Sequence, residues 1–214
     1  NKTKNINNEI EKIWSTGYSQ PEQCDFAFKH YLETVDNVSD VIWLRIDKAF
    51  KARRPSLAKY LARQLNDKDK ELVDLWYQAH RHPAEKLPLL SKSKDTPIHR
   101  KIIIHALDRL ARKDSLQAKE RWDEIKIKFQ FSTEQEEGIN KRIALSAAYQ
   151  HKAESKQLLQ QLPEKLKSDN AHLWLARIHL RDEDWIGLIK TINDMPDRLK
   201  TESEWIYWLA RAYE

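Results

Sequence analysis

The sequence has 214 residues, of which 33% are charged and 40% hydrophobic, and its mean hydropathy is −0.80. Three residues are glycine and eight are tryptophan, so the composition disfavours an all-β fold and is typical of a helix-rich chain facing water. The 38 basic and 33 acidic residues leave a net charge of +5, spread along the chain, which favours anionic partners without naming one.

The first ninety residues predict a series of short helices divided by clear turn signals. Gly17 stands at the position where many helices end in a left-handed residue, so the helix that begins near Ile6 ends there. Ser19 and Glu22 have the spacing of a capping box and predict the start of the second helix. Further helices are predicted to start at Ser39 or Asp40, at Pro55 and at Asn66, followed by a weaker segment that ends near Leu90.

The middle of the chain predicts longer helices. Thr96 followed by Pro97 is a strong helix start, and the segment Ile98–Leu110 has the most apolar helical face in the sequence. A partner helix is predicted over Ser115–Ile125. We interpret Lys126–Phe131 as a loop, because Ser132 with Gln135 gives a second capping box and a long helix follows through Tyr149. A further helix packs through Leu158, Leu159 and Leu162 and ends at Pro163.

A repeat is visible in the last third of the chain. The segments Trp174–Arg177 and Trp208–Arg211 both read Trp-Leu-Ala-Arg, and their spacing of 34 residues (208 − 174) is that of a two-helix repeat. Helices are predicted over Ala171–Leu180 and Trp185–Ile192, and Thr201 with Glu204 is predicted to cap the next copy. The sequence therefore predicts an all-α fold, a right-handed α-superhelix or solenoid of stacked antiparallel helix pairs, TPR-like, with about twelve to thirteen helices. We expect residues 1–214 to form one such domain.

No pattern of catalytic or ligand-binding chemistry stands out. Cys24 is the only cysteine, which excludes an intrachain disulfide and a Cys-rich metal site, and His80 with His82 lacks a third ligand at a zinc-like spacing. The three glycines lie far apart, so a phosphate-binding loop is excluded. No apolar run approaches the roughly eighteen residues of a membrane span. We predict no catalytic residue, no metal and no cofactor.

Aromatic and basic residues alternate in three short segments, Trp43–Arg45, Trp174–Arg177 and Trp208–Arg211, which could place stacking platforms beside positive charge. Tryptophan at helical spacing is more often core, so nucleic-acid binding is disfavoured. Arg177 and Arg211 are the candidate residues for contact with an anionic partner. Trp205 and Trp208 are expected to lie exposed on the last helix, where a further helix beyond Glu214 would pack against them.

Several segments, taken in order, resemble the soluble lytic murein transglycosylases. The start of the chain is similar to that family's Trp-x-Thr-Gly…Pro-x-x-Cys-Asp-x-x-Phe pattern through Trp14, Thr16, Gly17, Pro21, Cys24, Asp25 and Phe28. The resemblance continues through the segments Ile46–Leu65, Thr96–Lys119 and Glu204–Ala210.

The resemblance implies a superhelical region that accompanies a separate lysozyme-like catalytic domain. That family cleaves the β-1,4 bond between N-acetylmuramic acid and N-acetylglucosamine in peptidoglycan and leaves 1,6-anhydro ends. Its catalytic Glu-Ser pair is followed by Gly-Leu-Met-Gln, a sequel that neither Glu154-Ser155 nor Glu202-Ser203 has here. The expected chain is thus a non-catalytic scaffold segment of a longer periplasmic enzyme. Its expected partners are glycan strands, which Arg177 and Arg211 are expected to face, and the catalytic domain of its own protein, while its oligomeric state stays open.

A second hypothesis needs no cell-wall connection. The 34-residue spacing alone also fits a helical-repeat scaffold whose concave face binds another protein or a peptide. The sequence does not decide between the two readings, and a catalytic motif downstream in the full-length gene would favour the transglycosylase.

Overall fold

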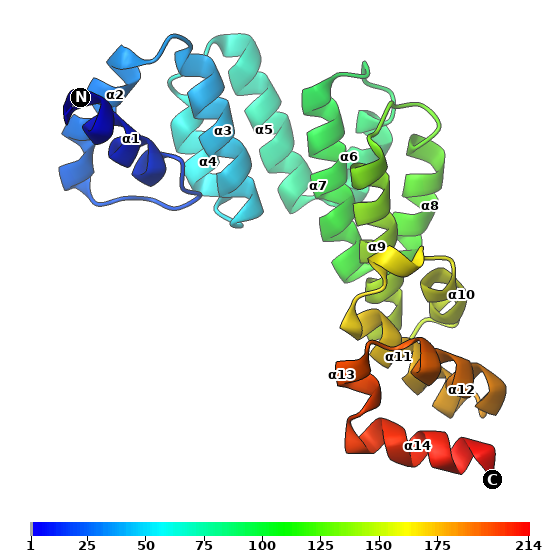
Figure 1. Cartoon of the computed structure of the whole chain (residues 1–214). Coiled ribbons are helices and arrows are strands. Elements are labelled where there is room, and N and C mark those ends of the chain that lie inside the picture. The colour runs from blue at the N-terminus through cyan, green and yellow to red at the C-terminus, as the bar shows by residue number, and fades with distance from the viewer. Residues whose placement is uncertain (1) are drawn as a thin grey trace. The chain divides into compact units, whose positions relative to one another are not determined.

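The computed structural model describes residues 2–214, with side chains described from residue 6 onward. These residues form fourteen α-helices and two short 3-10 helices, with no strand among them (Figure 1). The predicted all-α fold is confirmed, and the predicted count of twelve to thirteen helices was slightly low, since a helix of four residues, Asp197–Lys200, was missed. The chain divides into two compact units, Asn1–His82 and Pro83–Glu214.

Unit 1 is built from five α-helices and one 3-10 helix. Its elements are α1 (Lys2–Trp14), η1 (Glu22–Cys24), α2 (Asp25–Thr34), α3 (Val38–Lys51), α4 (Pro55–Ala62) and α5 (Asp67–Arg81). Helices α1 and α2 pack together, and α4 packs between α3 and α5. Between α3 and α5 the buried rings of Phe50 and Trp76 stack with their centroids 4.4 Å apart.

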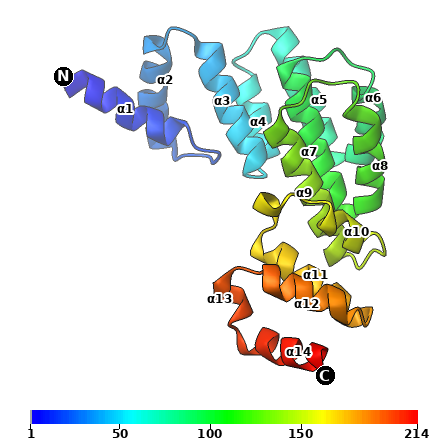
Figure 2. The ribbon, with the colours of Figure 1, turned by 45° about the vertical axis from the view of Figure 1, so that its right-hand side comes forward.

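Unit 2 continues the pattern of neighbouring helix pairs. Its elements are α6 (Pro83–Leu90), α7 (Pro97–Lys113), α8 (Ser115–Ile125), α9 (Thr133–Tyr149), α10 (Ser155–Gln160), η2 (Glu164–Leu166), α11 (Asp169–Arg181), α12 (Trp185–Asp194), α13 (Asp197–Lys200) and α14 (Ser203–Tyr213). Helix α7 packs on α6, α8 and α9, and α12 packs on α11 and α14. In Figure 2 the α11–α12 hairpin is followed by the short α13 and then by α14.

Two buried clusters hold the end of unit 2 together. One joins α9, α10 and α11 around Leu159 and Leu175, with Trp174 packed against its edge. The other joins α11, α12 and α14 around Ile192 and Trp205. Helix α11 therefore buries one face against α9 and α10 and another against α12, as expected for a helical repeat.

The strongest start signals in the sequence predicted the helix starts correctly. Thr96 accepts a hydrogen bond from the backbone N–H of His99, and Pro97 opens α7. Ser132 and Gln135 form the predicted capping box at α9. Pro55 opens α4.

Two predicted capping boxes were wrong. Pro21, with its extended backbone, starts the 3-10 helix η1, which runs directly into α2, so Ser19 caps nothing. Thr201 ends α13 instead of starting α14, and its hydroxyl donates to the backbone oxygen of Asp197 at 2.8 Å. In both cases a nearby proline precedes an additional short helix, so the residue predicted as the N-cap does not stand at the start of the α-helix that follows.

The first helix ends at Trp14, three residues before Gly17, and glycine is required at position 17 for a different reason from the one predicted. None of the described glycines has a positive φ. A Cβ at position 17 would instead lie 2.4 Å from the backbone oxygen of Lys48 and 2.9 Å from the Cβ of Ala52. Glycine is needed here because the turn after α1 lies directly against the backbone of α3.

Three helix hairpins share one turn geometry. Arg53, His151 and Glu183 have φ values of 58°, 53° and 54°, and each follows the first helix of a pair. After each, the next backbone N–H reaches back to the carbonyl five residues earlier, at 2.8 Å for Arg54 to Ala49. This is the Schellman arrangement, in which glycine is the commonest residue at the left-handed position.

No helix in the described part of the chain is both long and apolar enough to cross a membrane.

Candidate functional site

Arg177 lies on the exposed face of α11, above a half-buried tryptophan. Its guanidinium carbon is 5.8 Å from the centroid of the Trp174 ring. That ring also packs edge-on against Tyr149, with the centroids 5.2 Å apart. The expected pairing of a packed tryptophan with a covering arginine is therefore present, and the arginine head faces solvent. Its contact with a glycan stays a prediction.

Arg211 is exposed on α14 and forms an ion pair with Glu214. The second Trp-Leu-Ala-Arg segment thus differs from the first, because its arginine has a carboxylate partner. Exposed ion pairs of this kind exchange readily with other anions. A role for Arg211 in glycan binding likewise stays a prediction.

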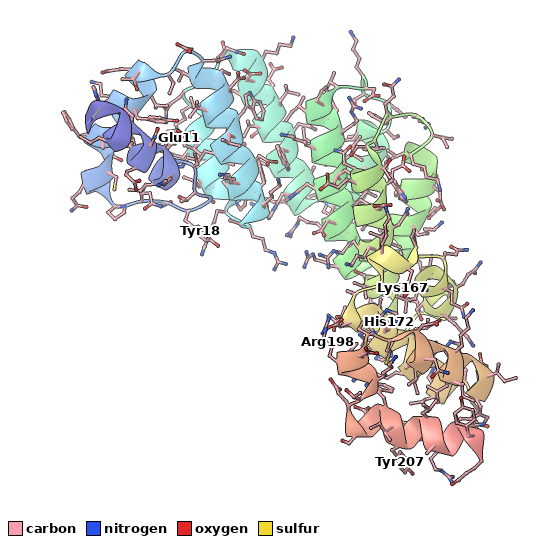
Figure 3. The ribbon with its side chains drawn as sticks, in the orientation of Figure 1. Glu11, Tyr18, Lys167, His172, Arg198 and Tyr207 are labelled. Atoms are coloured by element: carbon pink, nitrogen blue, oxygen red, sulfur yellow. The ribbon has the colours of Figure 1, made fainter. Side chains whose placement is uncertain are left out.

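The expectation that Trp205 is exposed was wrong. Its side chain is 0% exposed and lies in the cluster with Ile192 and Leu199. Trp208 is half-buried against the same cluster. The exposed apolar residues of α14 are instead Ile206, Tyr207 and Tyr213, and Figure 3 shows Tyr207 pointing away from the neighbouring helices. Helical spacing placed the tryptophans on one face, but that face is the inner one.

The histidines do not form a metal site. Within the described residues no three His, Cys, Asp or Glu side chains come together in a way that could hold a metal ion. His80 is buried beside Phe50, with the ring centroids 6.2 Å apart.

A polar network at the α11–α12 turn involves a buried histidine. His179 Nδ1 lies 2.8 Å from Asp184 Oδ2, which also accepts a hydrogen bond from Lys156 at 2.8 Å. The other carboxylate oxygen caps α12 by accepting from the Gly187 N–H. Lys156, the Gly187 N–H and His179 all hold the pKa of Asp184 far below its usual range. The pKa of His179 is lowered because burial disfavours its charged form, although Asp184 acts in the opposite direction.

This network is structural, because every polar group in it is used to hold the turn. A Cβ at position 187 would lie 2.2 Å from the His179 ring, so glycine is needed for the ring to pack there.

A cavity of about 820 Å³ lies among α1, α2, α3 and α4 of unit 1. Its inner wall is formed by buried side chains, namely Trp14, Phe28, Arg45 and Leu61. Exposed polar side chains form its rim, namely Ser19, Glu22, Asp25, Lys29, Glu33, Ser56, Tyr60 and Gln64. Three of the residues that carry the family resemblance, Trp14, Asp25 and Phe28, therefore line one pocket.

Arg45 is the unusual member of this wall. It is 4% exposed, and its guanidinium carbon lies 4.4 Å from the Trp14 ring centroid and 5.1 Å from that of Phe28. Its Nη2 donates to the backbone oxygen of Tyr18 at 3.3 Å, while its buried Nε has no hydrogen-bond partner among the described groups. Burial lowers the pKa of the Arg45 guanidinium, and Tyr60 and Asp25 act in the opposite direction.

Sequence reasoning named Trp43-Leu44-Arg45 as an aromatic-basic segment but did not select Arg45. The signal that could have found it is its position on α3. Arg45 lies beside Ile42, Ile46 and Ala49, which form the buried face of that helix. A charged residue within an apolar stripe is a candidate for a special role.

The comparisons with known proteins point to one family. No protein-family model matches the sequence, and no curated protein matches it. Among solved structures, the chain is similar to an inactive mutant of the lytic transglycosylase Slt from Pseudomonas aeruginosa. The TM-score is 0.83 at 26% identity, over 97% of this chain and 34% of that one.

Two further structures agree. The chain matches the 70-kDa soluble lytic transglycosylase in complex with bulgecin A, with a TM-score of 0.78 at 21% identity over 99% of this chain and 34% of that chain. It also matches the 70-kDa soluble lytic transglycosylase Slt70 from Escherichia coli, with a TM-score of 0.71 at 21% identity over 95% and 33% of the two chains. The chain thus spans about a third of the length of these proteins. The resemblance drawn from the sequence is confirmed: this chain is similar to a helical region of the soluble lytic transglycosylases.

Proposed function

We propose that this chain is a non-catalytic superhelical segment of a periplasmic soluble lytic murein transglycosylase. The parent enzyme cleaves the β-1,4 bond between N-acetylmuramic acid and N-acetylglucosamine in peptidoglycan and leaves 1,6-anhydro ends. The observation that carries the proposal is the match to lytic transglycosylase Slt over 97% of this chain at a TM-score of 0.83.

The role of the segment is to hold the catalytic domain and to guide anionic glycan strands. The net charge of +5 supports the second task, since it favours association with polyanions over the length of the chain. Arg177 supports it locally, because an exposed guanidinium next to a tryptophan ring can meet a sugar face and a carboxylate together. We also propose that residues 1–214 act as one superhelical domain.

Sedimentation with purified sacculi tests the proposal. The chain should sediment with sacculi at about 50 mM salt and stay in solution at about 500 mM, because exposed charge pairs are screened. It should not sediment with chitin, a neutral glycan that serves as the matched control. No anhydro-muropeptides should be released at any salt concentration.

Two outcomes would contradict the proposal. Release of anhydro-muropeptides by the chain alone would show that the segment is itself catalytic. Absence of binding to sacculi at low salt would favour the alternative, a helical-repeat scaffold for another protein.

A further inference from the structure

We propose that the pocket around Arg45 binds the carboxylate end of a short zwitterionic peptide. This inference rests on the geometry of unit 1 alone and does not depend on the proposed role in cell-wall cleavage.

The first argument is the unbalanced charge of Arg45. Buried arginines normally pair with a carboxylate, since a lone charge removed from water is strongly disfavoured. Arg45 forms no ion pair with any described carboxylate, and its one hydrogen bond goes to the Tyr18 backbone oxygen. The Trp14 and Phe28 rings stabilise the cation only partly. Among the described residues, the Arg45 cation therefore has no carboxylate in direct contact, although Asp25 favours its charged form.

The second argument is the geometry of the guanidinium. Arginine carries five N–H donors in a planar fork that matches the two oxygens of a carboxylate. Only one of those donors has a partner here. Because Trp14 and Phe28 hold the group in place from α1 and α2, a bound carboxylate would meet a preformed partner.

The charge of the rim decides which anion fits. Glu22, Asp25 and Glu33 are exposed at the mouth, against one lysine, Lys29. Three carboxylates there disfavour phosphate and polyanionic strands, which would bring more negative charge past them. A ligand with its own amino group would turn the same carboxylates into partners. A zwitterion satisfies both ends of the pocket.

The size and lining of the pocket fit a small peptide. About 820 Å³ lies within the range of cavities that bind small molecules, and it leaves room for two or three residues. Leu32, Leu57 and Leu61 line the walls between the arginine and the rim, so an apolar side chain on the ligand would be covered.

A titration with matched dipeptides tests the proposal. We expect the free dipeptide Ala-Leu to bind the chain and to shift the NMR signals of the Trp14 indole N–H and the Arg45 Nε–H. Its C-terminal amide, which lacks the carboxylate, should bind at least about tenfold more weakly. N-acetyl-Ala-Leu, which lacks only the ammonium group, should bind about threefold more weakly than Ala-Leu. Equal binding of the amide and the free acid, or tighter binding of inorganic phosphate than of Ala-Leu, would overturn the proposal.

Substitutions separate binding from folding. Arg45→Lys keeps the charge but loses the fork, and should weaken Ala-Leu binding by about tenfold. Arg81→Lys is the matched control, because Arg81 also lies over a ring, that of Tyr77, but outside the pocket. It should bind Ala-Leu as the parent chain does.

A third variant keeps Arg45 intact. Ser56 is exposed on α4 at the rim, so Ser56→Trp should obstruct the pocket and abolish binding without removing any buried group. If either pocket variant failed to fold by circular dichroism, the other would carry the test. Ala-Leu binding that is as tight as in the parent chain, in a folded Ser56→Trp or Arg45→Lys variant, would show that the peptide binds elsewhere and would overturn the proposal.

Discussion

The backbone oxygen of Lys48 lies so close to Gly17 that a Cβ at position 17 would stand 2.4 Å from it. The glycine of the Trp-x-Thr-Gly pattern thus marks the place where the turn after α1 meets α3. The same turn carries Tyr18, whose carbonyl accepts a hydrogen bond from Arg45 Nη2, the one hydrogen bond that Arg45 donates within the described part of the chain. Residue 17 therefore fixes both the packing of unit 1 and one wall of its pocket.

Gly17→Ala is expected to destabilise unit 1 by about 1–3 kcal/mol, because the added methyl group would force the turn after α1 away from the backbone of α3. Thermal unfolding followed by circular dichroism measures this loss. Gly138→Ala is the control: a Cβ at position 138 meets nothing within 4 Å, and the residue lies inside α9. It should raise stability by about 0.5–1 kcal/mol, since alanine favours helix over glycine. A Gly17→Ala chain as stable as the parent would contradict the close approach.

Gln150 links three helices of unit 2 through its amide. Its Oε1 accepts from the backbone N–H and the hydroxyl of Ser115, at 3.0 and 2.7 Å, and its Nε2 donates to the Ala111 oxygen at 2.8 Å. Since Ser115 is 0% exposed, Gln150→Ala leaves two buried donors without a partner. We expect a loss of about 2–3 kcal/mol in the free energy of unfolding, measured by urea denaturation. Gln160→Ala, at an exposed position of α10, should change stability by less than about 0.5 kcal/mol.

Acid should weaken unit 2 in two stages. The folded pKa of His179 is depressed by burial, so the unfolded chain binds a proton that the folded chain resists, and stability falls as the pH drops below about 6.5. The pKa of Asp184 is depressed chiefly by Lys156, so its contribution is present above about pH 4 and lost below it. Unfolding midpoints measured between about pH 3 and 8 should show both stages.

Asp184→Asn separates the two stages, because asparagine still caps α12 but carries no charge. The variant should lose less stability below about pH 4 than the parent chain, with Asp108 and Asp123 accounting for part of the remaining loss because their pKa values are also lowered. At neutral pH it should be less stable by up to about 1 kcal/mol, the pair with Lys156 being partly exposed. Asp182→Asn is the control, since the Asp182 carboxylate lies 3.7 Å from Lys156 and its side chain does not cap α12. A full second stage in the Asp184→Asn chain would assign it to another group.

Arg177→Gln is expected to leave the fold intact, because its head is exposed, and to weaken binding to sacculi about two- to fivefold at low salt. Arg211→Gln should have a smaller effect, since Glu214 already neutralises that charge. Arg181→Gln, on the same helix and paired with Asp182, provides the matched control. If all three variants bound sacculi equally to the parent chain, α11 and α14 would not form the glycan-facing surface.

The helices could be predicted from sequence where a local signal decides them. Thr96, Ser132 and Pro55 act through contacts within four residues, so their effect is visible in any short window of the sequence. The errors at Ser19 and Thr201 arose where a nearby proline offered the chain a second, shorter turn. Two competing local signals cannot be ranked without the packing around them.

The pocket could not be predicted, because it depends on contacts between distant residues. Trp14 and Phe28 were noticed as a family pattern, but nothing in the sequence shows that both rings enclose Arg45. The exposure of Trp205 was mispredicted for the same reason, since a helical stripe does not reveal which neighbour covers it. Arg177 was placed correctly because the spacing of three residues sets its position above Trp174.

Glycine in place of the left-handed residues Arg53, His151 and Glu183 should make the same fold more stable. All three are exposed, and each holds a side chain where glycine would relieve a strain of about 1 kcal/mol. Their three hairpins are separate, so the gains should add. A variant whose free energy of unfolding fell because of a substitution at a binding surface could therefore regain stability through a glycine at one of these turns, far from that surface.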